Sequence, residues 1–373
     1  MSLELTPLDP QSLSAAAQRA LGPGPGRMMA SKGMLPLPPA DQVAVLYQLS
    51  LDGDISISGA AKATANSLPE KLLVGTLADT TLDPRVLHFF AGMFADRPAV
   101  FDAIVLNPTI ADQTIAVLAQ KGGAREVDQI AQNEQALLRH PEIIAAMYMN
   151  RKARMSTIDR VVELAVRNEV KVPGIACWDE IARALLSDGP SSPDDDALVA
   201  AATSEYSDDA ALMQGDADAV ISEEEAAAAI EKAAAKAKVP LDKASVPAKI
   251  RMATLGDGPM RAQLIRDPLK IVAVAAIKSP AVTDSEAARY AANASLAEEV
   301  IRYISQKREW TKLYGVKVSL CRNPKTPIPE STKLLPFLRE KDLTNISKSR
   351  GVPSAVVSQA RKLIMQRRGG DKK

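Results

Sequence analysis

Aromatic residues are scarce in this chain of 373 residues, since phenylalanine, tryptophan and tyrosine together make up only 3% of it. This scarcity argues against a ligand pocket lined with aromatic rings. Alanine, leucine and other helix formers dominate the composition instead. Such side chains suit closely packed layers of helices, so the composition favours an all-α protein.

Histidine and cysteine are almost absent, because the sequence contains only His88, His140, Cys177 and Cys321. No HExxH, GxSxG, Walker or Rossmann pattern occurs. The two cysteines lie far apart without CxxC spacing, which is typical of reduced thiols in a cytoplasm. We therefore expect a protein that is not an enzyme, with no catalytic residue, no metal site and no cofactor.

Long apolar runs are also missing. The longest, residues 271–277, has about seven residues and is far too short to cross a bilayer. The first residues, Met1 to Glu4, lack the basic and apolar regions of a signal peptide. These features predict a cytoplasmic protein with no transmembrane segment.

What the sequence does contain is internal repetition. Residues 271–280 match residues 315–324 in their apolar pattern at an offset of 44, and residues 98–107 match 141–150 at an offset of 43. A weaker match joins residues 304–309 to 346–351 at an offset of 42. A period in the low forties indicates stacked helical units, each unable to bury its apolar face alone.

Helix start signals fit units of about three short helices. The pairs Thr283 with Glu286 and Ser295 with Glu298 have the spacing of a capping box, in which two side chains satisfy backbone donors at a helix start. Residues 271–277 are apolar nearly all round and predict a buried middle helix.

This pattern resembles armadillo or HEAT-type repeats over roughly residues 40–186 and 247–366. The resemblance implies an all-α fold with two α-solenoid blocks of roughly 42–44-residue helical repeats joined by an acidic linker. It also implies a scaffold that binds a partner protein along an extended helical surface.

The expected organisation has five parts. They are a flexible Pro/Gly-rich tail (1–38), an N-terminal helical-repeat domain (39–186), an acidic linker with an Ala-rich helix (187–246), a basic helical-repeat domain (247–366) and a basic tail (367–373). Charge is strongly segregated: residues 187–246 carry 4 basic and 14 acidic groups, whereas residues 247–373 carry 25 basic and 11 acidic groups. Such asymmetry bears on partners rather than on fold.

Basic residues recur at equivalent positions of the C-terminal units and predict a partner-binding stripe. The candidates are Lys307, Arg308, Lys312, Lys317, Arg322, Lys348, Arg350 and Arg361. The expected partner is a protein with an acidic surface. Three alternatives stay open: binding of nucleic-acid phosphates without sequence preference, binding of an anionic membrane surface, and ordinary solubilising charge.

The acidic stretch from Asp188 to Glu225 has two interpretations, a simple spacer or a segment that lies on the basic face and competes with the partner. Part of it also follows the spacing of a calcium-binding EF-hand loop, beginning at Gln214. Gln214 stands where that loop needs aspartate and Ala219 where it needs glycine, so calcium binding is disfavoured.

Overall fold

The computed structural model describes residues 3–188, 192–204, 215–237 and 239–370. Over these ranges every regular element is a helix, and no strand occurs, which confirms the all-α class. The chain divides into two compact units, Met1–Gly174 and Ile175–Lys373.

The helices of the first unit are short, most of them between seven and thirteen residues. They are η1 (Pro10–Ser12), α1 (Ala15–Leu21), α2 (Pro25–Ser31), α3 (Pro39–Ser50), α4 (Ile55–Asn66), α5 (Glu70–Leu77), α6 (Pro84–Phe94), α7 (Pro98–Val105), α8 (Asp112–Lys121), α9 (Ala124–Ile130), α10 (Glu134–Arg139), α11 (Glu142–Met149) and α12 (Met155–Arg167).

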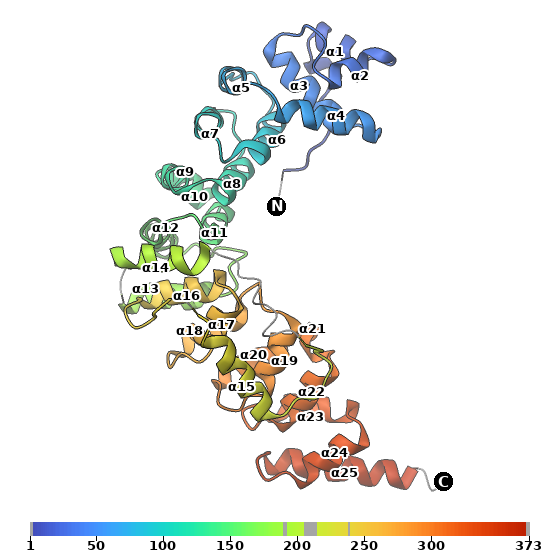
Figure 1. The fold of residues 1–373 in the computed structure, drawn as a ribbon, viewed down its shortest axis with the longest axis vertical. Helices are drawn as coiled ribbons and strands as arrows, with labels where there is room; N and C mark the ends of the chain where they lie inside the picture. The colour runs from blue at the N-terminus through green and yellow to red at the C-terminus, as the bar shows by residue number, and fades with distance from the viewer. Residues whose placement is uncertain (1–2, 189–191, 205–214, 238, 371–373) are drawn as a thin grey trace. The chain divides into compact units, whose positions relative to one another are not determined.

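Beyond α4 these helices form two rows. Helices α5, α7, α9, α10 and α12 follow one another in the first row, and α6, α8 and α11 form the second (Figure 1). In the first row α5 packs on α7, α7 on α9, and α10 on α12, and in the second row α6 packs on α8 and α8 on α11. The apolar side chains between the rows are fully buried, as Leu87, Phe101 and Ile144 illustrate.

A buried asparagine after α7 links this helix to α5, the helix before it in the same row. Asn107 follows α7, and its side-chain nitrogen donates to the carbonyl oxygens of Leu77 and Asp79 at the end of α5, at 2.9 and 3.0 Å. Its side-chain oxygen accepts the N–H of Thr109. The last carbonyls of a helix have no partner within that helix. Asn107 satisfies two carbonyls at the end of α5 and shapes its own turn at the same time.

The same contact recurs elsewhere in the chain. Asn150, after α11, donates to Ala119 and Gly122 at the end of α8, at 2.8 Å each. Asn323, after α22 (Tyr314–Arg322), donates to the carbonyls of Ala291 and Asn293 at 2.9 and 3.3 Å. Each of these asparagines also accepts the N–H of the residue two places on.

A serine takes the asparagine's place once. Ser279 follows α18 (Lys270–Lys278), and its hydroxyl donates to the Thr254 carbonyl at 2.7 Å. The four helices that end in this way are the segments whose sequences match at offsets of 43 and 44.

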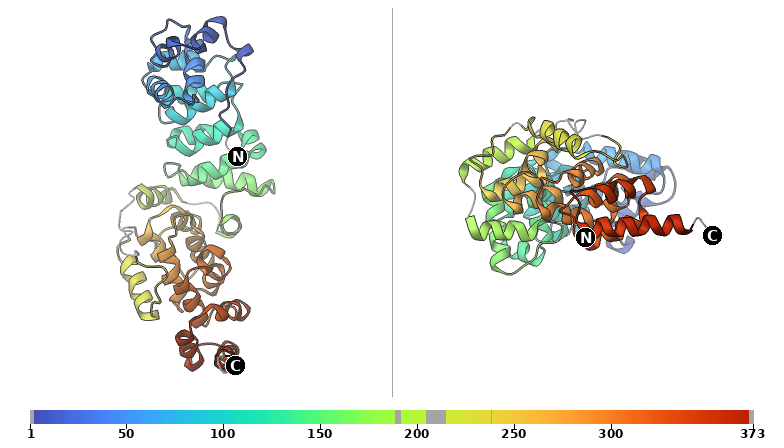
Figure 2. Two further views of the ribbon diagram at one scale, coloured as in Figure 1. Left: turned by 90° about the vertical axis from the view of Figure 1, so that its right-hand side faces the viewer. Right: turned by 90° about the horizontal axis from the view of Figure 1, so that it is seen from below.

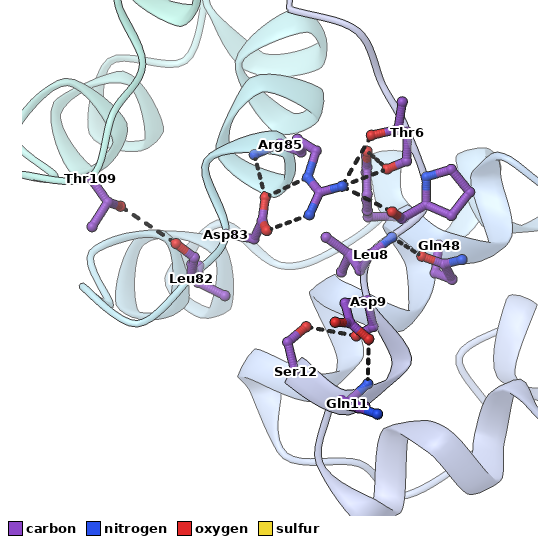
Figure 3. A network of polar contacts seen from close by, with 12 residues as sticks. Thr6, Leu8, Asp9, Gln11, Ser12, Gln48, Leu82, Asp83, Arg85 and Thr109 are labelled. Atoms are coloured by element: carbon purple, nitrogen blue, oxygen red, sulfur yellow. Dashed lines mark hydrogen bonds and ion pairs between the residues drawn. The ribbon is translucent and has the colours of Figure 1, made fainter.

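The N-terminal segment packs against the first unit, which differs from the free tail that we expected. Arg85 donates to Thr6 Oγ1 at 3.0 Å and to the Pro7 carbonyl at 2.9 Å, while Asp83 accepts from its guanidinium (Figure 3). Tyr47 donates its hydroxyl to the Thr6 carbonyl at 2.7 Å. The density of proline and glycine here therefore reflects tight turns between packed helices.

The second unit has the same kind of short helix. Its elements are α13 (Trp178–Asp188), α14 (Pro193–Ser204), α15 (Glu223–Ala234), α16 (Val246–Leu255), α17 (Gly258–Leu264), α18, α19 (Asp284–Ala292), α20 (Glu298–Gln306), α21 (Arg308–Thr311), α22, α23 (Ile328–Leu334), η3 (Leu335–Phe337), α24 (Glu340–Lys348) and α25 (Ser354–Gly370). The expected buried helix at residues 271–277 is α18, in which Val272, Ala273 and Ile277 are buried.

Successive packing also orders the second unit, where α16 contacts α18, α18 contacts α20, α19 contacts α22, and α24 contacts α25. Helix α15 lies on the outside, across α17 and α19 (Figures 1 and 2). Its Ala226, Ile230 and Ala233 are buried in that contact. Asp195, in α14, is also fully buried and accepts the Ser245 N–H at 3.0 Å. Helices α14 and α15, which lie within residues 187–246, thus pack on the helices that follow, where the sequence predicted a mobile linker with a solvated helix.

Only one of the two predicted capping boxes is present. Thr283 and Glu286 form a complete box at the start of α19, as predicted. The prediction for Ser295 is wrong, because its hydroxyl and its N–H both bind Asn293 Oδ1 and α20 begins only at Glu298. Glu286 has a second role, since it accepts a hydrogen bond from the buried Arg261 at 2.9 Å.

Replacing a linking asparagine tests its structural role. In Asn150→Ala, two buried carbonyls lose their donor, and we expect the free energy of unfolding to fall by roughly 2–4 kcal/mol. Urea denaturation followed by circular dichroism measures this. The control is Asn66→Ala, whose exposed side chain ends α4 without such a contact. Equal stability of the two variants would contradict the assigned role.

Replacing Arg85 tests the anchoring of the N-terminal segment. Arg85→Ala removes the donors that hold Thr6 and Pro7, so we expect amide hydrogen exchange of residues 3–12 to become faster. The control is Lys71→Ala, on an exposed position of α5. Unchanged exchange in Arg85→Ala would show that other contacts hold the segment.

Candidate interaction surface

The predicted basic residues all lie on helices α20 to α25 or the turns between them, and three of them have structural partners. Lys307 lies over the Trp310 ring at 4.0 Å and pairs with Glu309 at 3.8 Å. Lys317 donates to the Lys312 carbonyl at 2.9 Å. Arg361 donates twice to the Ser347 carbonyl at the end of α24. These cations help to hold the helices together.

The other five have no ion-pair or hydrogen-bond partner for their side chains among the described residues. They are Arg308, Lys312, Arg322, Lys348 and Arg350. All except the half-buried Arg322 are exposed. Unpaired cations on a folded surface are available to an anionic partner.

These five residues form two groups rather than one stripe. Arg322 and Lys348, at the ends of α22 and α24, line one cavity of about 510 Å³, and Arg350 follows close to its rim residue Gly351. Arg308 and Lys312 lie just before the start of α22. Since α22 has nine residues and therefore a length of about 13 Å, the two groups lie at its opposite ends.

Part of this charge has a structural reason. Arg322 and Lys348 each stand in the last turn of their helix. A cation there interacts favourably with the negative end of the helix dipole, which contributes about 0.3–1 kcal/mol. This effect explains why a cation occurs at each site, and it leaves the charged groups open to solvent.

Sequence reasoning missed Ser319, which lies in the same cavity. Ser319 is 3% exposed, and its hydroxyl has no hydrogen-bond partner within the described part of the chain. A buried hydroxyl without a partner costs free energy unless a ligand or water satisfies it. Its only signal in the sequence was a polar residue inside the apolar run of residues 315–321.

The aromatic residues near the cations serve packing. Trp310 is 2% exposed and lies between Tyr303, at 6.1 Å between ring centroids, and Lys307. Phe337 is the exception, being 68% exposed.

His88 and both cysteines are buried. His88 is buried beside Thr114, with 3.0 Å between Nδ1 and Oγ1, and burial, together with the nearby Lys121, lowers its pKa. Burial raises the pKa of Cys177, and it raises the pKa of Cys321 to about 12. Both cysteines are free thiols.

The acidic residues of the possible calcium loop bind backbone groups instead of forming a ligand cage. Asp216 accepts the Asp218 N–H, and Ser222 and Glu225 form a capping box at the start of α15. Gln214, the first position of that loop, lies outside the described residues. In the described ranges no group of three or more histidine, cysteine or acidic side chains is arranged to hold a metal ion.

Helices able to cross a bilayer are also lacking in the part of the chain that the structure describes, where none is both long and apolar enough. Comparison of the chain with protein-family models, with curated proteins and with solved structures found no match.

The burial of both cysteines predicts slow reaction with thiol reagents. A raised pKa keeps the thiol neutral at pH 8, and the neutral form is a poor nucleophile. We expect labelling of the folded protein by a chromogenic disulfide to be at least about 100-fold slower than in guanidinium chloride. Stoichiometric labelling of the folded chain within minutes would contradict this placement.

Proposed function

We propose that this protein is a non-enzymatic scaffold or adaptor, an α-solenoid of helical repeats that binds a partner protein through the surface of its C-terminal helices. The observation that carries this proposal is the recurring contact of Asn107, Asn150, Ser279 and Asn323. At these four places a helix ends in a buried polar side chain that satisfies the end of an earlier helix.

The contact supports a repeat because it joins neighbours only. In each case the end of one helix obtains a hydrogen-bond donor from the residue that follows a helix two or three places later in the chain, so the contact is local. The spacing of 43 and 44 residues between matched segments supports the same interpretation. Chains built in this way expose long surfaces, on which partners bind through many small contacts.

The unpaired cations support the choice of surface and partner. Arg308, Lys312, Arg322, Lys348 and Arg350 are concentrated around α22 and α24. A partner with acidic side chains gives the complementary potential, which steers encounter and selects against basic surfaces. We place the protein in the cytoplasm, in keeping with its two free thiols.

Nucleic-acid binding is the second candidate, because phosphates would also complement these five cations. Stacking on bases would need exposed rings, and among the aromatic residues discussed above only Phe337 offers one. An interaction of this kind would lose affinity steeply as salt is raised.

Charge reversal at two exposed positions tests the scaffold proposal. We expect Arg308→Glu combined with Arg350→Glu to weaken capture of the partner at low salt by about tenfold or more, with unchanged helical content by circular dichroism. Capture uses the full chain and lysate treated with nuclease, so that retention through nucleic acid is removed.

The matched control carries Lys32→Glu and Lys62→Glu, which make the same change in net charge on exposed positions of the first unit. Equal losses in both double variants would mean that only net charge matters, and no loss in either would exclude the proposed surface. Loss of capture on nuclease treatment alone would favour the nucleic-acid candidate.

A further inference from the structure

Residues 215–222, which we call the strap, contact the starts of α19 and α22, two helices that come much later in the sequence. Asp218 Oδ1 accepts the Tyr314 N–H, the first of α22, at 2.6 Å. The Ser285 hydroxyl, in the first turn of α19, donates to the Gly215 carbonyl at 2.7 Å. Helix α22 has no side-chain cap of its own, because Leu313 stands at its N-cap. The acidic strap supplies the missing cap.

The strap also passes unusually close to the backbone of α22. A Cβ atom placed on Gly315 would lie 2.8 Å from the Ala217 carbonyl oxygen and closer still to that of Ala219. Real Cβ atoms do not approach a backbone atom so closely, so the strap fits only because residue 315 is glycine. The strap is a physical reason for glycine at this place.

The cavity beside the strap is poorly matched by it. Ile221 of the strap lines this cavity together with Glu223, Ser319, Arg322 and Lys348. The lining thus holds two cations, one carboxylate and a buried hydroxyl without a partner in the described chain. An acidic side chain in place of the apolar Ile221 would balance the second cation and could accept a hydrogen bond from the hydroxyl.

The strap is weakly held. None of its residues is fully buried, and the hydrogen bonds of Asp218 and Gly215 are both exposed to solvent. The first buried side chains after the strap are Ala226 and Ile230, in α15. Exposed contacts of this kind open more readily than a packed core.

From these observations we infer that the surface under the strap is a binding site for an acidic peptide segment of a partner protein. This surface runs from the start of α22 to the cavity at the end of that helix. The strap occupies this site as a competitor within the chain. The partner segment has an aspartate that caps α22, small residues over Gly315, and an acidic side chain about three residues later that reaches Ser319, Arg322 and Lys348.

This inference deepens the proposed function and rests on it, since it names the kind of partner that the scaffold binds. Its test nevertheless needs no natural partner. If purified peptide binds while charge reversal at Arg308 and Arg350 leaves capture unchanged, the proposed surface fails and this site stands. If capture depends on Arg308 and Arg350 while the peptide does not bind, the proposed surface stands and this site fails.

The probe is a fluorescent synthetic peptide with the sequence of residues 215–234 and Ile221→Glu, and anisotropy measures its binding to the full chain at low salt. We expect Asp218→Ala in the chain to strengthen binding about tenfold, because the internal competitor loses its cap. The control Glu224→Ala removes the same charge from an exposed position of α15 and should leave binding unchanged. Equal binding by wild type and Asp218→Ala would overturn the inference.

Gly315→Ala is the second variant. Added to Asp218→Ala, it should reduce peptide binding at least about tenfold, because the new Cβ blocks the approach of any backbone. In the otherwise unchanged chain it should speed hydrogen exchange of residues 215–222, while helical content is kept because alanine favours helix. Undiminished binding, or unchanged exchange, would show that no backbone lies over residue 315.

Two further measurements fix the chemistry of the ligand. The peptide with Ile221→Glu should bind more tightly than the peptide with the natural sequence, and Ser319→Ala should remove part of that difference. A single-stranded oligonucleotide of equal charge should displace the peptide poorly. Equal affinity of both peptides, or displacement by the oligonucleotide as effective as by unlabelled peptide, would overturn the assignment to an acidic peptide.

Discussion

A helix that ends inside a protein leaves carbonyl groups without partners, and this constraint shapes the chain more than any other. The protein meets it with Asn107, Asn150 and Asn323. The side-chain nitrogen of each donates to one carbonyl in the last turn of an earlier helix and to one just after that helix, and the side-chain oxygen accepts an N–H of its own turn. The side chain is small, buried and uncharged, so it costs little to bury once both ends are satisfied. Short helices therefore stack without long loops.

The same constraint acts at helix starts, where N–H groups lack partners. Many starts are capped locally, as at Thr283, but α22 receives its cap from Asp218, 96 residues earlier in the chain. Because Asp218 belongs to a distant segment of the chain, an acidic group of another molecule is able to cap α22 in its place. The acidic segment of residues 187–246 thus contacts the basic segment of residues 247–373 at a specific place, the hydrogen bond between Asp218 and the start of α22.

Local pattern was enough to predict the all-α class and the buried helix α18, because apolar spacing decides both. It was not enough to predict the packing of residues 3–12, since Arg85 lies about 79 residues from its partners there. Ser295 shows a different reason: its sequence fits a capping box, but Asn293 lies closer and takes the same hydroxyl.

The basic surface could be predicted only in part. Repetition in the sequence singled out eight cations of the C-terminal helices, yet it gave no means of separating Lys307, which lies on Trp310, from Arg308, which has no partner in the described chain. Gly315 and Ser319 were visible as small residues inside an apolar run. Their role depends on a segment about 100 residues away, which no local pattern reveals.

We have proposed that an internal acidic segment and an acidic segment of a partner compete for one surface of this protein. The most direct measurement is the distance between spin labels at the exposed residues Val220 and Asn345, by double electron–electron resonance. The buried Cys177 and Cys321 should escape labelling. The account predicts one short distance in the free protein, which becomes longer and broader when acidic peptide is added. A distance that stays short and narrow at saturating peptide would contradict it.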